Sequence, residues 1–161
     1  MQIFNLSANI ENGFAKGMQY IVTPNAQNVV NNLINGFKTG IHSYTIIGTY
    51  GTGKSSFLLA LEADLDKKNR SKYLLNPSLL SECTEFEILN IVGDYTDLSV
   101  LLSRKLNREG TSNSVLDELK AYYQRLAKEN KFLLLVIDEF GKILEHAAKN
   151  NPEQELYFLQ K

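Results

Sequence analysis

The sequence has little of the chemistry that depends on thiols or on clustered histidines. Cys83 is the only cysteine among 161 residues, so it forms no internal disulfide, no cysteine-based zinc site and no CxxC redox pair. We expect a buried, unreactive thiol at this position. The two histidines, His42 and His146, do not have the short spacing of metal-binding histidines.

Long apolar runs and a strong charge of one sign are also missing. No run approaches the roughly 20 apolar residues that would span a bilayer, and the N-terminus lacks the basic-then-apolar order of a signal peptide. The formal net charge is −1, which argues against a surface that binds nucleic acid by charge alone but leaves a local basic patch possible. We therefore expect a cytoplasmic globular protein without a membrane partner.

Helical signals come first along the chain. A helix is predicted from about Thr23 to Phe37, because Thr23 can cap it, Pro24 suits its first position and apolar residues recur on one face. Gly40 marks its end. Further helices are predicted over Phe57–Leu65, over Leu98–Leu106 and from Pro152 to Lys161. Another is predicted to begin at Ser114, where Asp117 would complete a capping box.

Three strands are predicted between these helices. Short β-branched or apolar stretches cover Tyr44–Ile47, Phe86–Gly93 and Phe132–Ile137. The last is a run of six apolar residues, typical of a parallel strand covered on both faces. Strands that alternate with helices predict a layered α/β domain with a mainly parallel sheet.

The stretch "GTYGTGKS" lies between the first predicted strand and the next helix. Its fixed positions fit G-x-x-x-x-G-K-[ST], with Gly48, Gly51, Gly53, Lys54 and Ser55 in order. Glycines let the backbone wrap closely around a phosphate, and the following helix directs its positive end at the same group. Lys54 is expected to bridge the β- and γ-phosphates, and the Ser55 hydroxyl to bind Mg²⁺.

The rest of the expected nucleotide-binding segment consists of the residues beside these positions. They are Thr49, Tyr50, Thr52 and Ser56. Tyr50 and Thr52 occupy variable positions of the loop, where they carry no assignable chemistry.

Two carboxylates follow the last predicted strand directly. Ligands of open α/β sheets bind at the carboxyl ends of strands, so Asp138 is expected to hold Mg²⁺ and Glu139 to act as the base that orients the attacking water. Asp94 also follows a predicted strand, and we expect it to form a turn.

Together, "GTYGTGKSS" and "LLLVIDEFGK" resemble the Walker A and Walker B motifs of P-loop NTPases, within them the AAA+ and STAND-type ATPases. The resemblance implies a three-layer P-loop fold, ATP rather than GTP as ligand, Mg²⁺ as cofactor, and Lys54 and Glu139 as catalytic residues. It also implies self-association or contacts with other subunits, and a protein or nucleic-acid partner. The expected organisation is one domain over 1–161, with a leading segment and helix over 1–42 and the nucleotide-binding core over 43–161.

The family pattern continues beyond the Walker B strand and its helix with a sensor strand and a helical lid. The sequence ends inside the expected helix, so we interpret it as the N-terminal part of a larger ATPase that lacks its C-terminal strands and lid. Three functions stay open: an ATPase that drives conformational change, a nucleotide-dependent interaction module with little or no hydrolysis, and a small-molecule P-loop kinase. The second carboxylate, Glu139, disfavours the kinase.

Overall fold

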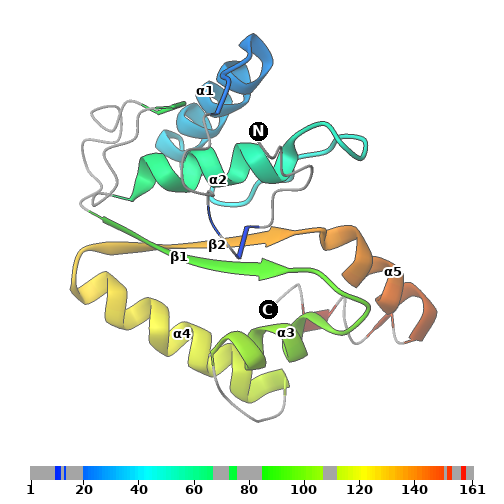
Figure 1. The fold of residues 1–161 in the computed structure, drawn as a ribbon. Coiled ribbons are helices and arrows are strands. Elements are labelled where there is room, and N and C mark those ends of the chain that lie inside the picture. The colour runs from blue at the N-terminus through cyan, green and yellow to red at the C-terminus, as the bar shows by residue number, and fades with distance from the viewer. Residues whose placement is uncertain are drawn as a thin grey trace. The chain divides into compact units, whose positions relative to one another are not determined.

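The computed structural model describes residues 10–11, 13, 20–66, 73–75, 85–106, 112–150, 152–153 and 157–158. Within these ranges it is a mixed α/β structure with five helices and a parallel sheet of two strands, β1 and β2 (Figure 1). The chain divides into two compact units, Met1–Phe86 and Glu87–Lys161. Among the helices that the structure describes, none combines the length and apolar character needed to cross a bilayer.

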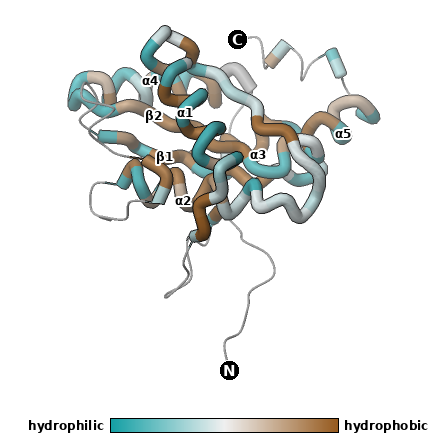
Figure 2. Tube along the Cα trace, turned by 90° about the horizontal axis from the view of Figure 1, so that it is seen from above, coloured by the Kyte–Doolittle hydropathy of each residue, from teal (hydrophilic) through white to brown (hydrophobic). Residues whose placement is uncertain are grey.

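Helix α1 of the first unit spans Pro24–Lys38, within one residue of the predicted Thr23–Phe37 at each end. Thr23 is its N-cap and accepts a hydrogen bond from the Ala26 amide at 3.2 Å, which satisfies one of the free N–H groups of the first turn. Hydrophilic and hydrophobic residues alternate along this helix (Figure 2). Its buried residues Ala26, Val30 and Ile34 recur at intervals of four, so the helix has one core face.

Helix α2, Lys54–Leu65, packs against the same apolar cluster. Phe57 and Ala60 are buried there with residues of α1 and with Leu74 and Leu75. The predicted helix over Phe57–Leu65 is therefore confirmed, with its start three residues earlier. Its first residue, Lys54, comes directly after the glycine loop.

The strand predicted over Tyr44–Ile47 is wrong. Residues 41–49 form no helix or strand, and Ile47 is 91% exposed. β-branched residues favour strands only where a neighbouring strand pairs with them, and here the Tyr44 hydroxyl instead donates to the carbonyl oxygens of Leu33 and Ile41 at 3.1 and 2.6 Å. The segment is thus attached to α1 by a side chain.

The two strands are β1, Glu85–Val92, and β2, Lys131–Asp138. All of β2 and all but the first two residues of β1 belong to the second unit. The strand predictions over Phe86–Gly93 and Phe132–Ile137 are confirmed to within one residue at each end. Between the strands run α3, Leu98–Lys105, and α4, Ser112–Lys128, and both helices lie on the same face of the sheet (Figure 1). Such a helical crossover is what joins parallel strands.

The core of the second unit forms between the sheet and the two helices α3 and α4. Leu89 and Ile91 of β1 are buried against Leu98 and Leu102 of α3. Leu133, Leu135 and Ile137 of β2, with Val115 of α4 and Ile143 from the following helix, complete the cluster. Alternate residues of each strand face the helices, as strand geometry requires.

Two helix predictions in this unit need correction. Helix α4 begins at Ser112, so Ser114 lies inside the helix and the predicted capping box with Asp117 is wrong. Helix α5, Phe140–Asn150, follows β2 directly and was not predicted. Of the helix predicted from Pro152, residues 152–153 and 157–158 are helical and the others lie outside the described residues.

Candidate functional site

The glycine loop turns sharply into α2. Gly51 and Gly53 have φ angles of 79° and 83°, in the left-handed region that residues with a Cβ rarely adopt. Gly53 is the N-cap of α2, and the helix starts at Lys54. Glycine is therefore required at both positions by the path of the backbone.

The Lys54 side chain folds back over this loop. Its Nζ donates hydrogen bonds of 2.8 Å to the carbonyl oxygens of Gly48 and Thr49. The Thr52 hydroxyl donates to the same Thr49 oxygen at 2.8 Å. A Cβ at Gly48 would lie 3.0 Å from the Thr52 Oγ1 and 3.7 Å from the Lys54 Cδ, so the small residue leaves room for the ammonium group above the loop.

The start of α2 carries no side-chain cap. Gly53 has no side-chain oxygen to offer, and the first turn contains no acidic residue. The partial positive charge at a helix N-terminus favours an anion when no carboxylate is present to neutralise it. Ser55 and Ser56 are half-buried in this first turn, while Thr49 and Tyr50 are exposed, Tyr50 to 95%. All predicted residues from Gly48 to Ser56 thus lie together in the first unit.

The predicted carboxylates lie at the end of β2 in the second unit. Asp138 is the last residue of the strand and is only 9% exposed. Its Oδ1 accepts a hydrogen bond of 2.9 Å from the Glu139 amide. Glu139 has a φ of 53°, an unusual conformation for a residue with a Cβ, and it begins the turn into α5.

Gly93 brings the end of β1 close to this turn. Its amide donates to the Asp138 carbonyl oxygen at 2.8 Å. A Cβ at Gly93 would overlap the Glu139 carbonyl oxygen and lie 3.1 Å from that of Asp138. The two strand ends can approach this closely only because residue 93 has no side chain.

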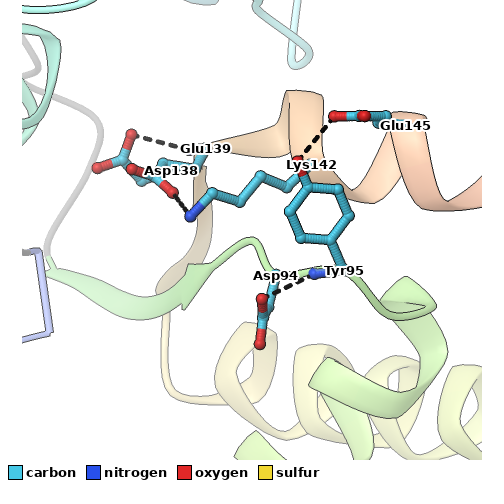
Figure 3. Close-up of polar contacts among 6 residues, drawn as sticks. All are labelled: Asp94, Tyr95, Asp138, Glu139, Lys142 and Glu145. Carbon is cyan, nitrogen blue, oxygen red and sulfur yellow. Dashed lines mark hydrogen bonds and ion pairs between the residues drawn. The ribbon is translucent and has the colours of Figure 1, made fainter.

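The Glu139 carboxylate forms an ion pair with Lys142 across one turn of α5 (Figure 3). The exposed fractions of the two side chains are 39% and 42%. The hydrogen bond to Glu139 is the main cause that raises the pKa of Lys142 above its usual range. The predicted base therefore has a cationic partner.

The loop after β1 contacts α5 beside this pair. Asp94 lies at the predicted turn, where its carbonyl oxygen accepts from the Thr96 amide at 2.8 Å and its Oδ1 accepts from the Tyr95 amide at 2.8 Å. The Tyr95 hydroxyl donates to Glu145 Oε2 at 2.9 Å (Figure 3). That hydrogen bond and the negative charge of Glu145 raise the pKa of the Tyr95 phenol.

The two residues predicted to bind Mg²⁺, Ser55 and Asp138, are of the kind that binds this ion together with a phosphate rather than alone. Within the described ranges, no group of three or more histidine, cysteine, aspartate or glutamate side chains could hold a metal ion. Mg²⁺ usually keeps several waters and binds through one or two protein carboxylates plus substrate phosphates. The Asp138 carboxylate and the Ser55 hydroxyl each offer an oxygen ligand of the kind that Mg²⁺ prefers.

Comparisons of the chain with family models, curated proteins and solved structures find no match. The interpretation of the glycine loop and of the carboxylates at the end of β2 therefore depends on these residues alone.

Sequence reasoning missed Lys142, Tyr95 and Glu145. The spacing of Glu139 and Lys142, three residues apart at the start of an amphipathic segment, was a usable signal for the ion pair. Tyr95 and Glu145 are 50 residues apart, and no local pattern connects them.

Proposed function

We propose that this chain binds ATP with Mg²⁺ through the segment Gly48–Ser56 and belongs to the P-loop ATPases of the AAA+ or STAND kind. The observation that carries the proposal is the placement of Lys54. Its ammonium group lies over the carbonyl oxygens of Gly48 and Thr49, at the start of a helix without a side-chain cap. An anionic phosphate at this point would find a cation, a helix N-terminus and glycines that do not obstruct it.

The three-layer P-loop fold is part of the proposal. What supports it is the parallel pair β1 and β2, which the helices α3 and α4 join as a crossover.

Hydrolysis would use the two carboxylates at the end of β2, Asp138 and Glu139. The oxygen of a water molecule forms a bond to the γ-phosphorus while the bond to the β,γ-bridging oxygen breaks, which gives ADP and inorganic phosphate. Glu139 would orient the water and accept its proton. When bound, Mg²⁺ supplies charge neutralisation at the β- and γ-phosphates, and Ser55 and Asp138 are the residues that would hold it.

Glu139→Gln tests this reaction directly. We expect the variant to bind ATP as the wild type does and to release phosphate about 10²-fold or more slowly, the range of a general base. Glu129→Gln is the matched control, because Glu129 also forms an ion pair with a nearby lysine, Lys131, at 2.8 Å. Equal phosphate release by wild type and Glu139→Gln would contradict the assigned role.

One observation favours the interaction module as second candidate. The ion pair with Lys142 occupies the carboxylate of the predicted base, so hydrolysis by this chain is expected to be slow. ATP binding without detectable phosphate release would select the interaction module, in which the bound nucleotide controls contacts with a partner.

A further inference from the structure

The Glu139 carboxylate is paired with an ammonium group that comes from the first turn of α5. We infer that Lys142 is a positioning residue that holds Glu139 in a resting position, and that this ion pair must open before Glu139 can orient a water molecule. The inference rests on the proposed function, since it concerns how that reaction is restrained. The pair itself is a contact of the second unit alone.

The backbone fixes both partners while leaving their side chains free to separate. The Lys142 amide donates to the Glu139 carbonyl oxygen at 3.0 Å, so the two residues share one helical turn. The next residue, Ile143, is fully buried in the apolar cluster. Both charged side chains remain partly exposed, and a partly exposed ion pair is weak enough to open when a competing charge arrives.

Contacts further along α5 hold the helix that carries Lys142. The Tyr95 hydroxyl donates to Glu145 at 2.9 Å, and His146 Nδ1 lies 3.3 Å from the Asp97 carboxylate. Both connect α5 to the loop at the end of β1. Lys142 therefore projects from a fixed helix, and its side chain is the movable part.

The chemistry of the pair predicts that opening it raises the rate of hydrolysis. The ammonium group occupies an oxygen of the Glu139 carboxylate, so the paired carboxylate is poorly placed to orient a water molecule. Lys142 has a second negative neighbour, because the charge of Asp94 also raises its pKa after the larger effect of Glu139.

The rate of phosphate release in a single turnover distinguishes restraint of Glu139 by Lys142 from a purely structural role of Lys142. For Lys142→Gln with saturating Mg²⁺ and ATP, we expect the rate to rise about two- to fivefold, the factor that a partly exposed ion pair contributes, with unchanged ATP affinity. Lys142→Arg should behave as wild type because it keeps the pair. Lys149→Gln is the matched control, since Lys149 also lies on α5 and pairs with Glu145 at 2.7 Å. The double variant Lys142→Gln/Glu139→Gln should be as slow as Glu139→Gln.

A rate for Lys142→Gln that equals or falls below the wild-type rate would overturn the inference and leave ATP binding intact. A spectroscopic measurement gives an answer that does not depend on turnover. In NMR spectra of protein with isotope-labelled lysine, the Lys142 side-chain signal should move, on addition of Mg²⁺ and a non-hydrolysable ATP analogue, toward its position in Glu139→Gln.

A Lys142 signal that is the same in wild type and Glu139→Gln would show that no pair forms and would overturn the inference. A signal that the bound analogue leaves in place would overturn it as well. Failure of the analogue to bind at all, measured on the same sample, would instead contradict the proposed function and the inference with it. Far-UV circular dichroism establishes that each variant is folded.

Discussion

The Gly93 amide donates a 2.8 Å hydrogen bond to the carbonyl oxygen of Asp138. The contact connects the end of β1 to the end of β2 at the turn where Glu139 and Lys142 form their ion pair. An added Cβ at Gly93 would lie 2.9 Å from the Glu139 carbonyl carbon. Its three nearest neighbours, the carbonyl carbon and oxygen of Glu139 and the carbonyl oxygen of Asp138, are all backbone atoms, so the strand ends would have to move apart to accept it.

Gly93→Ala is therefore expected to destabilise the protein by about 1–3 kcal/mol, the usual range for forcing an extra carbon into a packed site. The midpoint of urea unfolding measures the change. Gly141→Ala is the control, because a Cβ there meets no atom within 4 Å and replaces a helical glycine. That control should be stabilised by about 0.5–1 kcal/mol, and equal midpoints for the two variants would contradict the close approach of the strands.

Asp64 connects α2 to residues 73–75. Its carboxylate is 5% exposed and accepts hydrogen bonds from the amides of Tyr73, Leu74 and Leu75 at 2.8, 2.6 and 2.7 Å. Asp64→Asn replaces one acceptor oxygen with a donor, and we expect a loss of about 1.5–3 kcal/mol.

Amide hydrogen exchange locates this change. The Leu74 and Leu75 amides should exchange faster in Asp64→Asn than in the wild type. Asp117→Asn, at an exposed position of α4, should leave these amides unchanged. Unaltered protection of Leu74 and Leu75 in Asp64→Asn would refute the assigned contacts.

Tyr95 should titrate at higher pH than an ordinary tyrosine. The hydrogen bond to Glu145 is the largest cause, followed by the charge of Glu145 and burial. Since the folded state raises this pKa, the contact stabilises the protein fully below the unfolded pKa of about 10, and the stabilisation is lost as pH rises through the folded value.

NMR of isotope-labelled tyrosine rings measures this titration, with Tyr95→Phe to assign the signal. Glu145→Gln should bring the pKa of Tyr95 back toward its ordinary value. An unchanged titration in that variant would show that Glu145 is not the cause.

The elements that the sequence predicted well are those with complete local signals. Thr23 and Pro24 define the start of α1 through capping and a fixed φ, and β2 is a run of apolar residues that ends at Asp138. Helix α5 had a local signal too. Phe140, Ile143 and Ala147 recur at helical spacing, and the last two are buried.

The strand prediction at Tyr44–Ile47 failed because a strand depends on its neighbours. Tyr44 hydrogen-bonds to α1 instead, a contact between residues 11 positions apart that side-chain pattern does not reveal. Of the site, the loop from Gly48 to Ser56 is contiguous in sequence and could be predicted as a group. The contact of Tyr95 with Glu145 depends on the fold and could not.

Calorimetric titration of the folded protein with ATP and Mg²⁺ is the most direct test of nucleotide binding by the glycine loop. The wild type should bind one ATP, and GTP should compete less well. Lys54→Ala should bind at least about tenfold more weakly, because it removes a charge-assisted contact to phosphate. Lys38→Ala, at an exposed position of α1, should bind as the wild type does. Equal affinity of wild type and Lys54→Ala for ATP, or no binding by either, would contradict the account.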